Sequence, residues 1–199
     1  MKFEATPLQD VYLLEPKVFG DPRGFFLESW NAATFREAGF DINFVQDNQS
    51  RSARGILRGM HYQTEHTQGK LVRVTAGEVY DVVVDLRRNS DTFGQWYGAT
   101  LSAENHRMLW VPAGFAHGFY VTSEYADFLY KCTDIYHPAS EVCLAWDDPT
   151  VGIEWPVPPG EQPLLSGKDA QGLAWDCLLN TSPSPRDHLA HLVCRLLLE

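Results

Sequence analysis

Residues 54–70 concentrate side chains that could carry out acid–base chemistry. The stretch reads RGILRGMHYQTEHTQGK and places Arg58, His61 and Lys70 among turn-forming glycines, directly ahead of an alternating strand over residues 71–86. An imidazole titrates near neutral pH and can act as a base. A guanidinium is a fixed cation for an anionic ligand, and an ammonium can stabilise a developing negative charge. Together the three residues predict proton abstraction beside a bound anion.

A second segment, residues 110–130, adds another imidazole and a phenol. It carries the run PAGFAH, which ends at His117, and it closes with Tyr130. A charged hairpin on the rim of a sheet would explain any one of these residues taken alone. Two separated strand-and-turn segments that both carry acid–base groups are instead typical of opposite walls of one site. We therefore predict that the two segments face each other across a pocket.

Composition excludes several classes of protein. The chain has 199 residues, 44% hydrophobic and 21% charged, which is ordinary for one soluble globular domain. A net charge of −10 argues against a nucleic-acid surface. No run of about 18 apolar residues indicates a membrane span, and the N-terminal MKFEATP lacks a signal-peptide core, which predicts the cytoplasm. The four cysteines show no C-x-x-C spacing, so neither a zinc site nor a disulfide framework is predicted.

Short strands dominate the expected secondary structure. They are rich in aromatic or β-branched residues, and Gly, Pro, Asn or Asp separate them. Many short strands at regular spacing favour an all-β sandwich or barrel. The predicted strands are residues 11–14, 25–30, 44–47, 71–75, 78–86, 96–101, 107–111, 118–122, 126–133 and 143–146.

The elements between these strands position a few further groups. Residues 32–38 read as the one helix, with Asn31 as its N-cap and Gly39 as its stop. Alternation along the strand after Gly77 puts Asp81 and Asp85 on the same face. We expect Asp81 to face a polar cavity and Asp85 to face solvent.

Residues 175–199 differ in character from the rest of the chain. Residues 178–187 form a turn-rich break whose Ser-Pro-Ser-Pro can continue neither a strand nor a helix, and a short Leu-rich segment follows over residues 188–199. We therefore predict one domain over residues 1–174 and an atypical C-terminal tail that contributes nothing to function.

Seven motifs, in order along residues 1–174, resemble the dTDP-4-dehydrorhamnose 3,5-epimerase family of the cupin superfamily. The resemblance implies a cupin-type double-stranded β-helix, or jelly-roll sandwich, with a few short helices. It also implies a homodimer that exchanges an N-terminal strand, and it implies no cofactor and no metal. The motifs are DPRGFFLE (21–28), FVQDNQS (44–50), GILRGMHYQ (55–63), QGKLVR (68–73), PAGFAHG (112–118), FLYK (128–131) and LSGKD (165–169).

The implied activity is inversion of carbons 3 and 5 of dTDP-4-dehydro-6-deoxy-D-glucose, in dTDP-rhamnose biosynthesis. By resemblance, His61 is the catalytic base oriented by Asp169, Tyr130 is the acid on the opposite face, and Lys70 is the cation beside the carbonyl oxygen. Tyr136 matches the residue that stacks on the thymine ring, and Arg23 and Glu28 reach the neighbouring subunit's pocket. The substrate-binding set is Arg23, Phe26, Glu28, Gln46, Asn48, Arg58, His117, Tyr136, Glu141 and Lys168.

Three alternatives remain beside this interpretation. A single-centre epimerase would keep most of the same residues. A sugar-nucleotide-binding jelly roll without catalysis would need no paired base and acid. A metal cupin matches the second metal motif at His117, but the first motif needs a close His-x-His, and here His61 and His66 are five residues apart.

The tail over residues 175–199 departs from the family, and we interpret it as non-native, from a frameshift, an assembly fault or a vector-derived extension.

Overall fold

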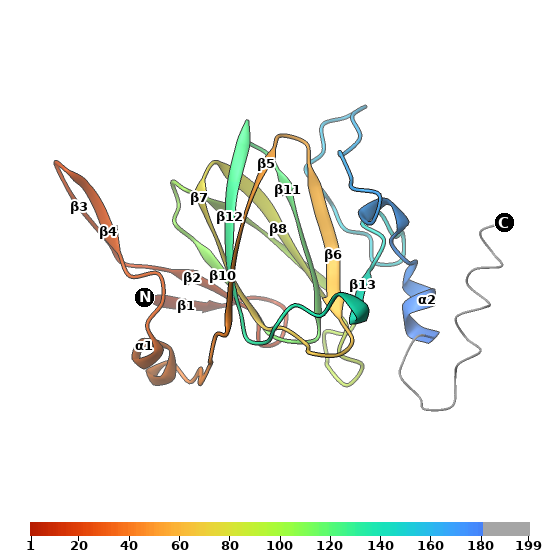
Figure 1. Ribbon diagram of the computed structural model, residues 1–199, viewed down its shortest axis with the longest axis horizontal. Coiled ribbons are helices and arrows are strands. Elements are labelled where there is room, and N and C mark those ends of the chain that lie inside the picture. Colours follow the sequence, from red (N-terminus) through yellow and green to blue (C-terminus); the bar gives the residue numbers. More distant parts are fainter. Residues whose placement is uncertain (181–199) are drawn as a thin grey trace.

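Two antiparallel sheets face each other in the protein, and a hairpin extends from one end (Figure 1). The computed structural model describes residues 1–180. The all-β sandwich predicted from the strand pattern is confirmed, and within those residues the α-helices are two short ones. The larger sheet has the order β1 (Lys2–Ala5), β2 (Tyr12–Glu15), β10 (Met108–Val111), β7 (Lys70–Ala76), β12 (Tyr125–Cys132), β5 (Gln46–Ala53). The smaller sheet has the order β13 (Glu141–Cys143), β6 (Leu57–Gln63), β11 (Phe115–Val121), β8 (Glu78–Asp85), β9 (Trp96–Ser102).

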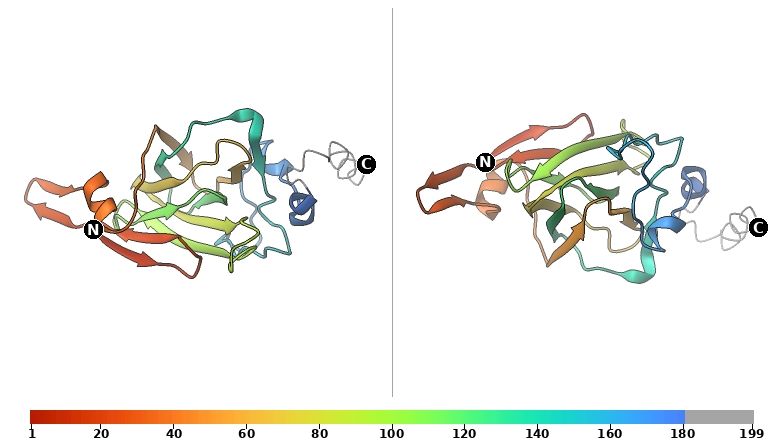
Figure 2. Two further views of the ribbon diagram at one scale, coloured as in Figure 1. Left: turned by 90° about the horizontal axis from the view of Figure 1, so that it is seen from below. Right: turned by 90° about the horizontal axis from the view of Figure 1, so that it is seen from above.

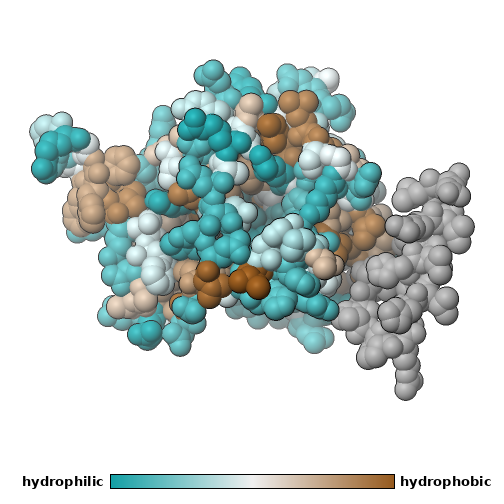
Figure 3. Space-filling model, viewed as in Figure 1, coloured by the Kyte–Doolittle hydropathy of each residue, from teal (hydrophilic) through white to brown (hydrophobic). Residues whose placement is uncertain are grey.

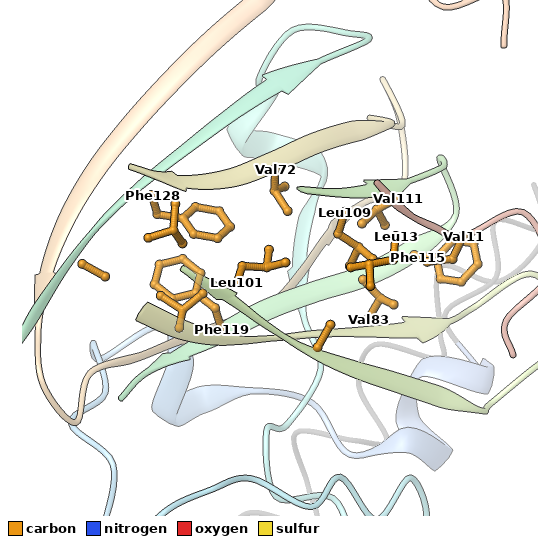
Figure 4. Close-up of a cluster of buried hydrophobic side chains, with 14 of the residues drawn as sticks. Val11, Leu13, Val72, Val83, Leu101, Leu109, Val111, Phe115, Phe119 and Phe128 are labelled. Atoms are coloured by element: carbon orange, nitrogen blue, oxygen red, sulfur yellow. The ribbon is translucent and has the colours of Figure 1, made fainter. Parts of the chain in front are cut away.

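The main core lies between the two sheets (Figure 4). Val72 and Phe128 come from the larger sheet, and Val83 and Phe119 from the smaller one. The rings of Phe119 and Phe128 stack with centroids 4.2 Å apart, so they tie the two layers together. A second cluster covers the outer face of the smaller sheet, which explains why β8 is apolar on both faces.

The helix signals are confirmed at their predicted positions. In α1 (Ala32–Glu37) the Asn31 side chain accepts hydrogen bonds from the amides of Ala33 and Thr34. Gly39 follows with a φ of +94°, a conformation that favours glycine. α1 packs against the outer side of the larger sheet through the buried ring of Phe35.

An apolar hairpin stands away from the sandwich. It consists of β3 (Val18–Asp21) and β4 (Gly24–Leu27), which pair only with each other. All three ribbon views show it projecting beyond the sheets (Figures 1 and 2). Figure 3 shows hydrophobic side chains gathered on it behind a hydrophilic tip, and Phe25 and Phe26 are 63% and 67% exposed. Such an exposed apolar ribbon is typical of a surface that meets another chain.

Two local predictions were wrong. Residues 57–63, read as part of a glycine-rich turn, form strand β6. Gly59 has a φ of +137°, and a Cβ there would lie 2.5 Å from the Cα of Gly118, so this glycine permits close approach of β6 to β11. Asp85, expected in solvent, is fully buried and accepts hydrogen bonds from Arg87, Ser90 and Thr92. The burial of its carboxylate is thus offset by five hydrogen bonds, three of which come from the positively charged Arg87.

The C-terminal segment runs along the edge of the smaller sheet. Parallel bridges join Ile56 to Leu164 and Leu144 to Leu173, and the turn η2 (Asp169–Gln171) lies between them in the chain. The predicted tail begins with α2 (Trp175–Asn180), whose Trp175 is 7% exposed in the second core cluster. Residues 178–180 of the predicted turn-rich break belong to this helix, contrary to the prediction. The rest of the break and the Leu-rich segment over residues 188–199 lie outside the described residues. No helix in the described part of the chain has the length and apolarity to cross a membrane.

Candidate active site

A cavity of about 640 Å³ opens between the two sheets. All but three of the predicted site residues line it, although they come from positions more than 120 residues apart in the chain. The predicted site residues that line the cavity are Gln46, Asn48, Arg58, His61, Lys70, His117, Tyr130, Tyr136, Glu141, Lys168 and Asp169.

The two sheets supply different chemical groups to this cavity. Strand alternation in β5 turns Gln46 and Asn48 toward the cavity, and Tyr130 of β12 is the direct cross-strand partner of Asn48. On the smaller sheet, His61 of β6 is paired with His117 of β11. His61 and Tyr130 therefore stand on different sheets. The prediction that the two sequence segments form opposite walls was wrong, however, because each segment contributes to both sheets. His61 lies beside His117 in the smaller sheet, and Lys70 of β7 lies beside β12 in the larger one.

A hydrogen-bonded pair of His61 and Asp169 lies at the centre of the site. His61 Nε2 lies 2.6 Å from Asp169 Oδ1, and Asp169 also accepts hydrogen bonds from the Ser166 hydroxyl and the Gly59 amide. Burial works to raise the pKa of Asp169, but these bonds and the nearby imidazole hold it below its ordinary value. Burial also lowers the pKa of His61, which keeps this imidazole neutral and able to accept a proton.

Glu141 connects this pair to the cavity mouth. Its Oε1 is 3.0 Å from His61 Nδ1, and its Oε2 accepts a 2.5 Å hydrogen bond from the Tyr136 hydroxyl. The Lys168 ammonium also donates to Oε2. The Tyr136 amide in turn donates to Gln46, which fixes the loop that carries this ring.

Burial shifts the pKa values of Lys70 and Tyr130 in opposite directions, because it disfavours the charged form of each group. Burial lowers the pKa of the Lys70 ammonium, and the nearby charges of Glu141 and Asp81 only partly oppose this. Burial raises the pKa of Tyr130, so its phenol is fully protonated at neutral pH. The cavity thus offers a protonated phenol and a neutral imidazole from different sheets, with the amino group of Lys70 in its lining.

A second histidine–carboxylate pair lies beside Lys70. His117 Nε2 is 3.0 Å from both carboxylate oxygens of Asp81, which is fully buried. Asp81 therefore lies behind the cavity wall, where it orients His117, rather than in the wall itself.

Three predicted residues lie outside this cavity, namely Arg23, Phe26 and Glu28. Arg23 and Phe26 lie on the projecting hairpin, where the Arg23 guanidinium pairs with Asp21. Sequence reasoning also missed cavity-lining residues. Tyr62 and Gln63 line the cavity but are absent from the predicted set. Gln63 anchors the Tyr136 loop by accepting a hydrogen bond from the His137 amide, and nothing in the sequence signals this role beyond its place in the GILRGMHYQ motif.

The described residues contain one group that could hold a metal ion. The ligand atoms of His61, Cys143 and Asp169 lie within 4.8 Å of one another. Burial raises the pKa of the Cys143 thiol to about 12, however, and this thiol donates to the Gly59 carbonyl. A protonated thiol is a poor ligand, so we assign no metal to these residues.

Comparison with known proteins supports one family. The family model described as dTDP-4-dehydrorhamnose 3,5-epimerase matches residues 5–176. A protein of that name from Pseudomonas aeruginosa is 60% identical over 181 residues, which cover 89% of this chain and 99% of that protein.

Solved structures agree with the sequence match. RmlC from Legionella pneumophila, a dTDP-6-deoxy-D-glucose-3,5-epimerase crystallised with dTDP-4-keto-L-rhamnose, is 53% identical, with a TM-score of 0.85 over 91% of this chain and 94% of that one. ChmJ from Streptomyces bikiniensis, a 3′-monoepimerase in complex with dTDP-quinovose, is 34% identical, with a TM-score of 0.79 over 85% of each chain. With its sandwich, its motifs and these matches, the chain belongs to the dTDP-4-dehydrorhamnose 3,5-epimerase family.

Proposed function

We propose that the protein inverts carbons 3 and 5 of dTDP-4-dehydro-6-deoxy-D-glucose, which gives dTDP-4-dehydro-L-rhamnose for dTDP-rhamnose biosynthesis. One observation carries the proposal. A neutral imidazole, His61, and a protonated phenol, Tyr130, face each other from different sheets across one cavity. Inversion of a carbon needs removal of a proton from one face and delivery of a proton to the other, and this arrangement supplies both groups.

Each neighbour of the pair has a role in the proposed reaction. The 4-keto group acidifies the hydrogens on the two adjoining carbons. Asp169 holds the proton of His61 on Nε2, and it stabilises the imidazolium that forms. Nδ1 is then the base once substrate displaces the Glu141 carboxylate from its 3.0 Å contact with that nitrogen. The Lys70 ammonium stabilises the negative charge that develops on the carbonyl oxygen. Tyr130 then donates its proton to the opposite face of the enolate.

The rest of the cavity suits a sugar nucleotide. Arg58, which donates a 2.9 Å hydrogen bond to the Ser52 hydroxyl, would pair with the diphosphate, since a guanidinium suits phosphate oxygens. The Tyr136 ring, 49% exposed at the mouth, is available to stack on thymine. Gln46 and Asn48 line the same wall and can bond the polar groups of the ligand.

Isotope exchange tests the function directly. We expect incubation with dTDP-4-dehydro-6-deoxy-D-glucose in deuterated water to place deuterium at carbons 3 and 5 of the product, as read by NMR. Label at only one carbon would select the single-centre alternative, for which the 3′-monoepimerase ChmJ is a structural precedent. No label, with binding intact, would select a sugar-nucleotide-binding protein without catalysis.

We further propose a homodimer in which the β3–β4 hairpin completes the neighbour's site. Arg23 and Phe26 lie on this exposed apolar hairpin, outside their own cavity. Inactive Arg23→Ala and His61→Ala chains, mixed and refolded, should then recover about a quarter of wild-type activity, since half the dimers are hybrids with one intact site.

A matched mixture controls this experiment. His61→Ala with Tyr130→Phe places each change in its own chain's cavity, so hybrid dimers of these two variants contain no intact site. Recovery in this mixture would mean that His61 and Tyr130 do not act in the same cavity. No recovery in a proven Arg23→Ala and His61→Ala heterodimer would place Arg23 outside the neighbour's pocket.

A further inference from the structure

Both ring nitrogens of His61 face carboxylates. Nε2 is bonded to Asp169, and Nδ1 lies 3.0 Å from Glu141 Oε1. Nδ1 is buried and makes no in-line hydrogen bond, so Glu141 lies beside its lone pair rather than capping it. When Nδ1 captures a proton, the Glu141 carboxylate is the acceptor closest to hand. Glu141 is thus more than a contact for substrate.

Glu141 also joins the buried base to the surface of the protein. Its side chain is 11% exposed, and its second oxygen is bonded by the Tyr136 hydroxyl and the Lys168 ammonium. Tyr136 is 49% exposed, and the Lys168 side chain is 50% exposed. A proton that reaches Glu141 has therefore arrived at the edge of solvent, whereas His61 Nδ1 has no contact with solvent of its own.

The proposed reaction needs a route by which the proton captured by His61 can leave for solvent. Each inversion leaves His61 protonated and Tyr130 deprotonated, so a two-centre epimerase must restore both groups between the first carbon and the second. We propose that Glu141 is a proton relay, which takes the proton from His61 Nδ1 and passes it to solvent between the two inversions. This inference rests on the proposed function and assigns Glu141 a role in resetting the base.

The steps balance without any further reactant. The C–H bond breaks, its electron pair remains in the enolate, and an N–H bond forms at Nδ1. That N–H bond then breaks as an O–H bond forms at Glu141 Oε1, and the proton leaves to water. On the opposite face, the Tyr130 O–H bond breaks as a new C–H bond forms at the carbon. The resulting phenolate takes one proton from water, so no net proton is gained or lost.

Electrostatics around the relay favour onward transfer. Burial lowers the pKa of His61, which makes its imidazolium a ready donor. Burial works to raise the pKa of Glu141, but its bonds from Lys168 and Tyr136 outweigh this and hold the pKa below its ordinary value. Glu141 therefore holds the proton only in passing and returns to the carboxylate form.

Replacing Glu141 by glutamine tests the relay, because the amide keeps the shape but cannot accept a proton. Glu141 also lines the substrate cavity, so the readout is the single-turnover rate of each inversion, followed as deuterium at each carbon. We expect the second inversion to slow by about tenfold or more relative to the first, so that singly inverted product accumulates. Glu141→Ala should show the same accumulation, and formate at constant pH and ionic strength should speed the second inversion by replacing the missing carboxylate.

Glu154→Gln is the matched control, since it makes the same chemical change at an exposed site outside the cavity. It should show neither accumulation nor a response to formate. Equal slowing of both inversions in Glu141→Gln, or a raised KM alone with no response to formate in Glu141→Ala, would overturn the relay and leave Glu141 as a substrate contact. Absence of any exchange in the wild-type protein would instead reject the proposed function.

Discussion

Replacing His61 by alanine should reduce turnover by about a hundredfold to ten-thousandfold, the usual contribution of a general base. The fold should persist, because the ring is partly exposed to the cavity, with 23% of its side chain accessible, and Asp169 keeps its bonds from Ser166 and Gly59. Nucleotide binding should also persist, since the predicted thymine and diphosphate contacts, Tyr136 and Arg58, are unchanged. Steady-state kinetics, thermal unfolding and calorimetric binding of dTDP measure the three quantities.

His66 provides the control for this change. It lies in the loop after β6, five residues from His61, where its exposed ring pairs with Asp134 and its φ is +52°. Asparagine tolerates that conformation, so His66→Asn should leave turnover within about twofold of wild type, as is usual for surface substitutions. Turnover of His61→Ala within a few-fold of wild type would reject His61 as the base.

Local patterns predicted the all-β class, most of the strands and five of the residues that line the cavity. Gln46 and Asn48, which period-two alternation in β5 turns toward the cavity, were predicted from the family resemblance instead. The same kind of pattern failed at β6. Gly55 and Gly59 read as turn residues, but Gly59 serves a close approach to Gly118, a contact between strands that no local window contains.

Long-range placement explains the other differences. Asp169 reaches His61 because the chain returns along β6 through the Ile56–Leu164 bridge, more than 100 residues later. Spacing along the sequence carries no signal of that return, so this pairing came from the family resemblance alone. Asp85 was expected in solvent because the sequence does not show that the hydroxyls of Ser90 and Thr92, in the following turn, donate hydrogen bonds to its carboxylate.

Replacing Lys70 by methionine should separate activity from stability. We expect turnover to fall by about a hundredfold to a thousandfold, the cost of removing one preorganised group that stabilises developing charge. Methionine preserves the length and apolar stem of the side chain, so the cavity should keep its shape. Isotope exchange at carbons 3 and 5, together with kcat and KM, would show whether proton abstraction itself is lost. Full retention of exchange would remove Lys70 from the enolate-stabilising role.

At neutral pH, Lys70→Met should have a larger free energy of unfolding than the wild-type protein. The pKa of Lys70 is lowered by burial, so the unfolded chain binds this proton more tightly than the folded one. The resulting destabilisation is complete below the folded-state pKa and disappears as pH rises through the ordinary value of the free side chain. The stability advantage of Lys70→Met should therefore shrink as pH rises, in denaturant unfolding measured at several pH values.

Lys131→Met is the control, because Lys131 pairs with the exposed Asp47 and should change stability by only about 0.5 kcal/mol. A destabilised Lys70→Met would mean that packing around the ammonium outweighs the cost of burying its charge.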